Sequence, residues 1–285
     1  MLYKFALAGA TGQIGRLLKR ELSKYGGVKA LSRDDLTIPS DCQHVVNAAG
    51  YTKFNDKVER YWHDNIRLAL ELVVSAQRVG AQYHQISSEA VAEYRTAPLI
   101  ESLFDPCAHP SMNDYALSKV LVEKTVLSVI KSGHLSIYRC SDVVPSLATF
   151  KTEWRPDHWL SIMFAAGREA FEVRDDFPIW IATAQQMAKA LAILIAEDEV
   201  NYGVYHLLGT RVLWSTLYDA ASEISSGFTN LARQVRPIIR IDPPLADCIS
   251  QRETEELLKG IGFHWNPLTS NYWEEFGRYA TERML

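Results

Sequence analysis

Near the start of the chain three glycines recur at intervals of three residues, in the run Gly9-Ala10-Thr11-Gly12-Gln13-Ile14-Gly15. The run follows an apolar segment, residues 3–8, and opens a segment, residues 14–25, whose apolar residues fall at helical spacing. A tight turn between a strand and a helix brings backbone N–H groups and the positive helix end close to a pyrophosphate. The run therefore predicts a dinucleotide-binding turn, the alternative being an ordinary strand-to-helix turn rich in small residues.

Strand-like and helix-like segments alternate after this turn. The patterns predict strands at 3–8, 28–32, 44–49, 82–87, 135–139 and 203–208, and helices at 14–25, 66–79, 115–130, 184–196 and 253–259. Such alternation favours right-handed βαβ units, so we expect an α/β fold with a Rossmann-like doubly wound parallel sheet. The stretch 33–43 is too short for a full crossover helix, and a trimmed connection is expected there.

The character of the chain changes after about residue 145. We therefore predict an NAD(P)-binding Rossmann core over residues 1–145 and a mixed C-terminal substrate lobe over 146–285, with residues 184–208 returning to the core. Tryptophans and arginines crowd the start of the lobe. Trp154 and Trp180 are candidate substrate contacts, although aromatic side chains more often form the core of such a lobe.

Composition excludes several classes of protein. The 285 residues are 47 % hydrophobic and carry a net charge of −4, which does not favour binding to nucleic acid or anionic membranes. No apolar run reaches the roughly 18 residues of a membrane span, and no signal-peptide pattern is seen. The four cysteines form no CxxC pair, which predicts reduced thiols and no metal site. We expect a cytoplasmic protein whose partner is a small-molecule substrate.

The end of the second predicted strand bears on the choice of cofactor. An acidic side chain there binds the ribose hydroxyls of NAD, whereas a nearby arginine suits the phosphate of NADP. The strand ends in Ser32 and Arg33, which favours NADP. Asp34 or Asp35 could instead reach the ribose, so NAD remains open, and Arg33 could merely solvate a loop.

Tyr115 and Lys119 are four residues apart in a predicted helix and therefore share a face. Tyrosine has a reference pKa of about 10, and a neighbouring ammonium lowers such a pKa toward neutrality. The tyrosine can then give a proton to a carbonyl oxygen. Ser88, at the end of a predicted strand, can hold the same oxygen. Alone this spacing is common on exposed helices, but here it follows the glycine turn in the expected order.

Five runs, GATGQIG, VVNAAGYT, ISSEAV, YALSK and GVYHLLG, together resemble the extended short-chain dehydrogenase/reductase family. The sequence is most similar to its dTDP-4-dehydrorhamnose reductase branch. The resemblance is strong to about residue 145 and weaker beyond. In many relatives the helices around 57–79 and 115–131 form a dimer face, which implies a homodimer.

The residue patterns and the resemblance together assign a role to each candidate position. Catalysis is assigned to Ser88, Tyr115, Lys119 and Asn65. Cofactor binding is assigned to Gly9, Thr11, Gly12, Gln13, Ile14, Gly15, Ser32, Arg33, Asp35, Ala48, Ala49, Gly50, Tyr51, Tyr115 and Lys119. Substrate contacts are assigned to Thr52, Ser88, Glu89, Trp154 and Trp180. Arg139 is expected to be structural.

Departures from the family pattern affect the substrate more than the chemistry. The family often has Thr-Asp-Tyr-Val-Phe where this chain has Ser88-Glu89-Ala90-Val91-Ala92, so the wall facing the substrate is altered. We expect a reductase that moves hydride from NAD(P)H to the carbonyl of a nucleotide-linked 4-keto sugar or a related ketone. The alternatives are an NAD-dependent sugar epimerase or dehydratase, which Ala90 beside Glu89 disfavours, and a non-catalytic nucleotide-binding regulatory subunit.

Overall fold

A computed structural model describes most of the chain. The described residues are 4–52, 58–92, 108, 112–130, 133–153, 160–161, 178–196, 203–213, 215–217, 219–220 and 251–284. Trp154, one of the expected substrate contacts, lies outside them. Arg155, Arg168 and Arg174 of the expected lobe also lie outside them.

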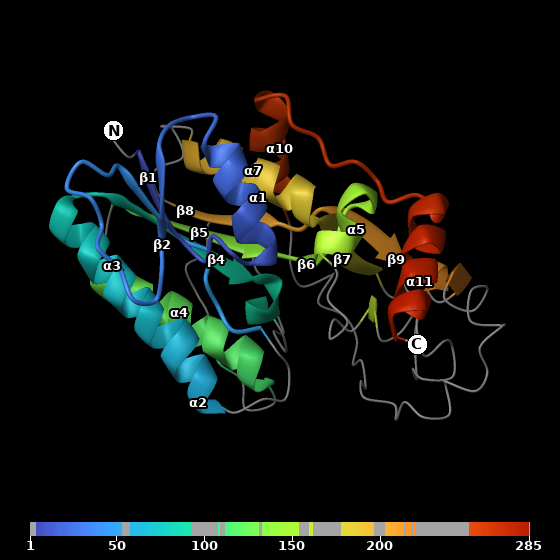
Figure 1. Ribbon diagram of the computed structural model, residues 1–285, viewed down its shortest axis with the longest axis horizontal. Helices are drawn as coiled ribbons and strands as arrows, with labels where there is room; N and C mark the ends of the chain where they lie inside the picture. Colours follow the sequence, from blue (N-terminus) through green and yellow to red (C-terminus); the bar gives the residue numbers. More distant parts are fainter. Residues whose placement is uncertain are drawn as a thin grey trace.

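A six-stranded sheet forms the centre of the molecule (Figure 1). Its strands are β1 (Phe5–Ala8), β2 (Val28–Leu31), β3 (His44–Asn47), β4 (Gln82–Ser88), β5 (Leu135–Cys140) and β8 (Gly203–Leu207). They lie in the order β2-β1-β3-β4-β5-β8, and each neighbouring pair is parallel. This confirms the predicted α/β fold. The strand order reverses direction at β1, and ligands of open α/β sheets bind outside the carboxyl ends of the strands at that point.

Helices cover both faces of this sheet (Figure 1). On one face α1 (Gln13–Leu22) packs against α7 (Ala184–Ala196), and on the other α3 (Leu68–Val79) packs against α4 (Asp114–Val129). Two buried apolar clusters follow, one beneath each helix pair, because each parallel strand presents apolar side chains to both faces. The helix predicted at 184–196 has these bounds and packs against α1.

A second, three-stranded sheet lies beside the first. It contains β6 (Asp142–Val144), β7 (Pro178–Thr183) and β9 (Thr210–Leu213), with β6 parallel and β9 antiparallel to β7. Near it lie η3 (Leu147–Thr149), α5 (Phe150–Glu153) and α11 (Ser270–Met284), whereas α10 (Arg252–Gly260) packs against β8 of the six-stranded sheet. The sequence predicted α10 but not these three strands.

Two local departures from regular structure prepare the site. The connection from β2 to β3 contains no helix or strand, as predicted, and begins with a turn in which the Ser32 N–H donates to the Asp35 carbonyl and the Asp35 N–H donates to the Ser32 hydroxyl. After β3 the chain is helical from α2 (Val58–Tyr61), earlier than predicted, and passes through a π-helical segment, η1 (Trp62–Arg67), into α3. Such π-helical segments often mark functional sites.

Candidate active site

A cavity of about 380 Å³ opens at the carboxyl ends of β1, β3, β4 and β5. Eleven of the expected site residues line it: Gly12, Gln13, Ile14, Gly15, Ala48, Ala49, Gly50, Thr52, Ser88, Tyr115 and Lys119. Six lining residues were not predicted: Ile86, Ser87, Cys140, Ser141, Asp142 and Val143. The other described candidates lie outside this lining, namely Gly9, Thr11, Ser32, Arg33, Asp35, Tyr51, Asn65, Glu89 and Trp180. The fold thus unites the glycine turn with Ser88, Tyr115 and Lys119.

The three glycines of the turn have different reasons to lack a side chain. A Cβ on Gly9, whose φ is +80°, would lie 2.5 Å from the backbone of Ala48. A Cβ on Gly15 would lie 1.9 Å from the Gly9 carbonyl oxygen. A Cβ on Gly12 would meet only that oxygen, at 3.4 Å, and Gly12 lines the cavity. Gly9 and Gly15 are therefore required for packing, whereas Gly12 leaves space for a ligand.

The start of α1 is suited to an anion. Gly12 is its N-cap and supplies no side-chain oxygen, and the first turn of the helix carries no acidic residue. The amide nitrogen Nε2 of Gln13 is buried and has no hydrogen-bond partner. Unpaired N–H donors at a helix N-terminus are the groups that bind the pyrophosphate of a dinucleotide, so the residues present fit such a cofactor.

Tyr115 and Lys119 lie on the first turns of α4. Asn113 caps this helix by accepting a hydrogen bond from the Ala116 N–H at 2.9 Å. Lys119 is buried, its Nζ lies 5.7 Å from the centre of the Tyr115 ring, and it donates to the Ile86 carbonyl at 3.5 Å. Burial lowers the pKa of Lys119, and the nearby Cys140 and Glu123 oppose that change. The lysine is thus held beside the tyrosine on one helix face.

A buried ionic network holds the elements that carry these residues. The Arg139 guanidinium donates to both oxygens of Glu123, at 3.1 and 2.7 Å, and both side chains are fully buried. Ser87 donates to the same carboxylate at 2.6 Å, and His206 lies 3.2 Å from the guanidinium. The network therefore fixes α4 against β4, β5 and β8. Arg139 is placed here as a structural residue.

Asn65 lies behind the cavity wall, in the π-helical segment η1. Its side chain accepts from the Tyr51 N–H at 2.5 Å and donates to the Tyr51 carbonyl and to the Ser118 hydroxyl, at 3.2 and 3.0 Å. A Cβ on Gly50 would lie 3.4 Å from Asn65 Oδ1 and 3.5 Å from Lys119 Nζ. The side chain of Asn65 thus ties the loop after β3 to α4, which is a positioning arrangement.

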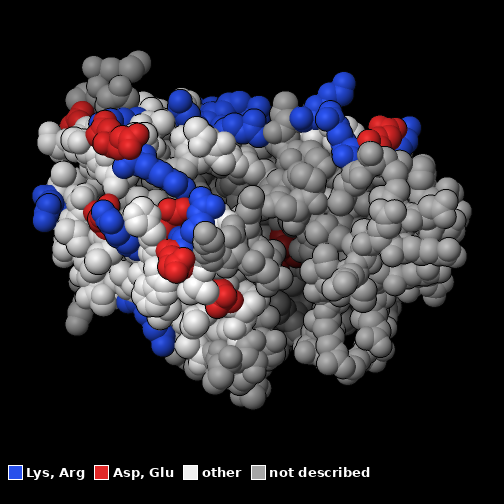
Figure 2. Space-filling model, turned by 60° about the horizontal axis from the view of Figure 1, so that its bottom comes forward, with Lys and Arg blue, Asp and Glu red and all other residues white. Residues whose placement is uncertain are grey.

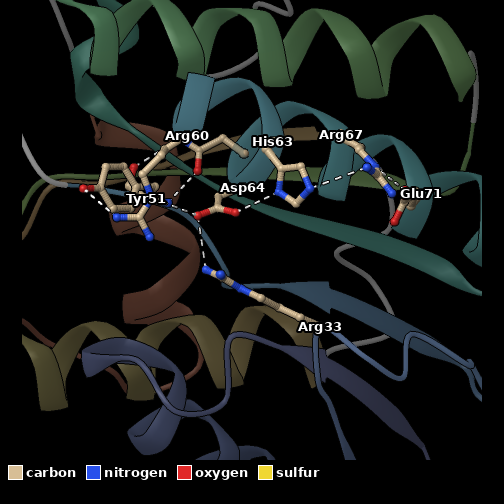
Figure 3. A network of polar contacts seen from close by, with 8 residues as sticks. Arg33, Tyr51, Arg60, His63, Asp64, Arg67 and Glu71 are labelled. Atoms are coloured by element: carbon tan, nitrogen blue, oxygen red, sulfur yellow. Dashed lines mark hydrogen bonds and ion pairs between the residues drawn. The ribbon is translucent and has the colours of Figure 1, made fainter. Parts of the chain in front are cut away.

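Arg33 and Asp35, which were expected to bind the cofactor, form contacts with other residues of the chain. Arg33 is paired with Asp64, with 3.2 Å between Nη2 and Oδ2, in a network that includes Arg60 and His63 (Figure 3). Asp35 is exposed, accepts from the Thr37 N–H at 2.9 Å and pairs with Lys29. The hydrogen bond with Thr37 is the largest cause that lowers the pKa of Asp35.

Two carboxyl groups lie close together just beyond the ends of β4 and β5. Asp142 lines it, and Glu89, in η2 (Glu89–Ala92), accepts a hydrogen bond from the Asp142 backbone. Burial, reinforced by the charge of Asp142, raises the pKa of Glu89 well above its usual range. Its oxygen Oε2 is buried without a hydrogen-bond partner. Figure 2 shows the surface hollowed, with acidic atoms visible deep inside.

One feature of the sequence could have predicted Asp142 as a residue of the site. Asp142 stands two residues beyond the end of β5, and side chains at the carboxyl ends of neighbouring parallel strands converge. The neighbouring Cys140 is buried, and burial raises its pKa to about 12, so it remains a thiol. Trp180 packs against a small apolar cluster that contains Val91 and Leu208, outside the cavity lining, and its indole N–H has no hydrogen-bond partner.

Among the described residues, neither a metal site nor a membrane span is found. No group of three or more His, Cys, Asp or Glu side chains in this part of the chain is arranged to hold a metal ion. No helix among the same residues has the length and apolar character needed to cross a membrane.

Comparison with known proteins agrees with this geometry. A model of the NAD dependent epimerase/dehydratase family matches residues 6–169, more than half of the chain. The chain belongs to this family. An NAD(P) cofactor is typical of its members, and the glycine turn is arranged to hold one.

Within the epimerase/dehydratase family, one curated relative is a dTDP-4-dehydrorhamnose reductase from Burkholderia thailandensis, 29 % identical over 250 residues that cover 76 % of each chain. Among solved structures, the thiolation-reductase di-domain of an archaeal non-ribosomal peptide synthetase has a TM-score of 0.78 and 15 % identity, covering 100 % of this chain and 76 % of the other. MoeE5 in complex with UDP-glucose and NAD has a TM-score of 0.68 and 16 % identity, covering 99 % of this chain and 100 % of the other. The two structures share the fold.

Proposed function

We propose that the protein is an NAD(P)H-dependent reductase that transfers hydride to a carbonyl group. One observation carries the proposal: Ser88, Tyr115 and Lys119 line the same cavity as the glycine turn. The cavity thus presents a proton donor beside a cofactor cradle. A reduced nicotinamide bound there supplies the hydride.

The three side chains divide the remaining work. Tyr115 gives its phenolic proton to the carbonyl oxygen as that oxygen gains negative charge. Lys119 stabilises the tyrosine that has lost its proton and is the residue to hold the ribose next to the nicotinamide. Ser88 donates a hydrogen bond to the same substrate oxygen and orients it. Asn65 positions the loop after β3 against α4.

The substrate that we propose is a nucleotide-linked 4-keto sugar or a related ketone. The similarity to a dTDP-4-dehydrorhamnose reductase supports the sugar. The altered wall, in which Asp142 lines the cavity and Glu89 accepts a hydrogen bond from the Asp142 backbone, supports a substrate that presents hydroxyl groups there rather than a negatively charged group. We also propose NADP as the preferred cofactor, because Arg33 and Arg60 lie at the end of the sheet where the adenosine would bind.

The test begins with the purified protein, checked for cofactor carried through purification. NADPH and NADH are titrated by fluorescence, and NADPH oxidation is then followed with a dTDP-linked 4-keto sugar and a panel of neutral ketones. Tyr115→Phe should lower turnover by about 100-fold to 10,000-fold and leave NADPH binding unchanged. Tyr25→Phe, at an exposed tyrosine, is the matched control and should retain full activity. Near-normal turnover by Tyr115→Phe would contradict the assigned proton donor.

A second function, that of an NAD-dependent sugar epimerase or dehydratase, is favoured by one observation. Asp142 supplies the second carboxyl group that Ala90 does not supply, beside a Glu89 whose raised pKa suits a general acid. An enzyme of this kind retains its NAD and regenerates it within each cycle. NAD found in the purified protein, with no NADPH oxidation by any ketone, would favour this function over the reductase.

We further propose a homodimer formed through the helices after β3. Val58, Trp62 and Leu70 are exposed there, and Trp62 is 54 % accessible to solvent. A face of this kind matches an interface between two copies of the chain. Light scattering after gel filtration should report a dimer, and Trp62→Glu should convert it to a monomer. A monomeric wild type would rule the interface out.

A further inference from the structure

Ser118 lies on α4 between the two residues that carry the proposed chemistry, three residues after Tyr115 and one before Lys119. It is 2 % exposed and is not among the residues that line the cavity, because its side chain faces η1, against which α4 packs. A buried hydroxyl group costs stability unless it is hydrogen-bonded. The partners of this hydroxyl group therefore indicate what it does.

The single proton of the Ser118 hydroxyl fixes the direction of its hydrogen bonds. The hydroxyl donates to the Tyr115 carbonyl at 2.7 Å, so its oxygen accepts from Asn65 Nδ2, 3.0 Å away. The Asn65 amide is thereby oriented with its oxygen 2.5 Å from the Tyr51 nitrogen and its nitrogen 3.2 Å from the Tyr51 carbonyl oxygen. An amide turned over at this place would lose all three of its bonds. Ser118 thus determines which way Asn65 faces.

These bonds form one chain from the cofactor side of the cavity to the proposed proton donor. The residues on either side of Tyr51 line the cavity, in the loop 48–52 that follows β3. From the Tyr51 backbone the chain passes through Asn65 and Ser118 to the Tyr115 backbone. A displacement of the loop therefore reaches the tyrosine through two side chains.

The π-helical segment η1 makes this chain possible. Asn65 lies within η1 and is 3 % exposed, whereas α3, which follows directly, buries apolar residues against the sheet. An extra residue in a helical turn rotates the side chains before it by about 100° relative to those after it. One continuous helical stretch can therefore present apolar side chains to the core and an amide to Ser118.

The bond to the Tyr115 carbonyl acts on the first turn of α4. Asn113 fixes this turn from its start, by accepting from the Ala116 N–H at 2.9 Å. A serine that donates to a carbonyl about one turn earlier bends a helix slightly. Ser118 therefore influences the direction of the turn that carries the tyrosine side chain. A displacement of about 1 Å at a reacting group can lower a rate about 100-fold.

We propose that Ser118 is a positioning residue, through which the loop beside the cofactor site keeps Tyr115 in register with the cofactor. The inference rests on the proposed function, because it takes Tyr115 as the proton donor. Ser118 contacts neither substrate nor cofactor. It acts through Asn65 on one side and through the Tyr115 carbonyl on the other.

Steady-state kinetics of Ser118→Ala provide the first test, with NADPH and a ketone that the wild type reduces. The kcat should fall about tenfold to 100-fold, because alanine breaks the chain between Asn65 and Tyr115. The KM for the ketone and the affinity for NADPH should change by less than about threefold, since the residues that line the cavity are unchanged. Ser118→Thr keeps a hydroxyl that can bond to the same carbonyl and should recover most of the kcat.

Ser128→Ala is the matched control. Ser128 is an exposed residue of the same helix, and its hydroxyl also donates to a carbonyl three residues earlier, that of Thr125, at 2.7 Å. This variant should keep the kcat of the wild type. An equal loss in Ser118→Ala and Ser128→Ala would overturn the inference. Thermal unfolding verifies each fold, and Ser118→Cys, which is similar in size and a weak donor, replaces Ser118→Ala if the latter does not fold.

A double-mutant cycle tests whether Ser118 acts through Asn65. Asn65→Ala and Ser118→Ala break the same hydrogen bond, so the double variant should have about the same kcat as Asn65→Ala alone. Losses that multiply would show that the two residues act independently, and would overturn the link. Asn65→Asp, which removes only the donors of the side chain, serves in the cycle if Asn65→Ala does not fold.

Amide hydrogen exchange of the full chain tests the link without a catalytic step. The Tyr51 N–H donates to Asn65, so Ser118→Ala should speed its exchange about fivefold to tenfold, and Ser128→Ala should leave it unchanged. Faster exchange in α4 alone, with an unchanged kcat, would make Ser118 a residue that only stabilises its helix. Failure of the wild type to bind NADPH or to reduce any ketone would remove the proposed function, whereas the exchange at Tyr51 would still decide the link between Asn65 and Ser118.

Discussion

The two sides of the cavity are built by different physical means. On the side of the glycine turn, backbone packs against backbone: Gly9 lies against Ala48, and Gly15 lies against Gly9. On the side of Tyr115 and Lys119, a buried ion pair between Arg139 and Glu123 holds the helix that carries them. The first side tolerates no added atoms at Gly9 and Gly15, and the second tolerates no loss of charge at Arg139 and Glu123. This difference predicts that the two sides respond to substitution in opposite ways.

Breaking the ion pair should produce the largest loss of stability. Glu123→Gln leaves the Arg139 guanidinium buried without its counter-charge, which should lower the free energy of unfolding by about 3–5 kcal/mol. Urea denaturation measures this loss. Glu71→Gln, which breaks the exposed pair with Arg67, should cost about 1 kcal/mol or less. Similar costs for the two variants would show that the buried pair does not hold the catalytic side.

Substitutions in the glycine turn should separate packing from binding. Gly15→Ala places a Cβ against the Gly9 carbonyl and should lower the free energy of unfolding by about 1–3 kcal/mol. Gly12→Val extends into the cavity, so it should weaken NADPH binding by at least about tenfold while the protein remains folded. Denaturation and fluorescence titration of both variants provide the measurements. Undiminished NADPH binding by Gly12→Val would show that the pyrophosphate does not bind next to Gly12.

The substrate wall should respond to pH. The raised pKa of Glu89 means that the folded state keeps a proton which the unfolded state releases above about pH 4.5, so this residue costs stability as the pH rises. Glu89→Gln should therefore raise the melting temperature at neutral pH and change it little near pH 4. Asp142→Asn should show part of the same gain, because it removes the neighbouring charge. An unchanged melting temperature of Glu89→Gln at neutral pH would contradict the raised pKa of the buried Glu89 carboxyl group.

The smallest expected effect lies in the sheet itself. His84 is fully buried between His44 and the Tyr138 hydroxyl, 3.1 and 3.0 Å away, and burial followed by the charge of His44 lowers its pKa well below 6.5. Below about pH 6.5 the unfolded chain binds a proton at this position that the folded state does not bind. The free energy of unfolding should therefore decrease as the pH is lowered. His84→Gln should flatten this part of the pH profile, and the exposed His134→Gln should not.

Local patterns were sufficient for much of the fold. The glycine turn, the helix at 184–196 and the strands of the parallel sheet follow from spacing that a few neighbouring residues determine. The short strands β6, β7 and β9 were missed because their pairing joins residues far apart in the chain. The helical spacing predicted a helix only from residue 66, because the π-helical segment η1 interrupts the α-helical spacing before α3.

The residues of the candidate site likewise fall into those that local motifs predicted and those that only the tertiary structure brought together. Gly12, Ser88, Tyr115 and Lys119 were expected from their motifs and the structure brings them together. Asp142 was not expected, because its nearness to Glu89 arises only when β5 lies beside β4. The same holds for Asp64, whose pairing with Arg33 spans 31 residues.

By itself the sequence determined which residue types stand at the turn, the strand ends and the first turns of α4, because those choices depend on local backbone geometry. The tertiary structure alone decided which charges face one another: Arg33 and Arg60 with Asp64, Arg139 with Glu123, and Glu89 with Asp142. Charge pairing depends on distance and burial in space, and neither is encoded by spacing along the chain.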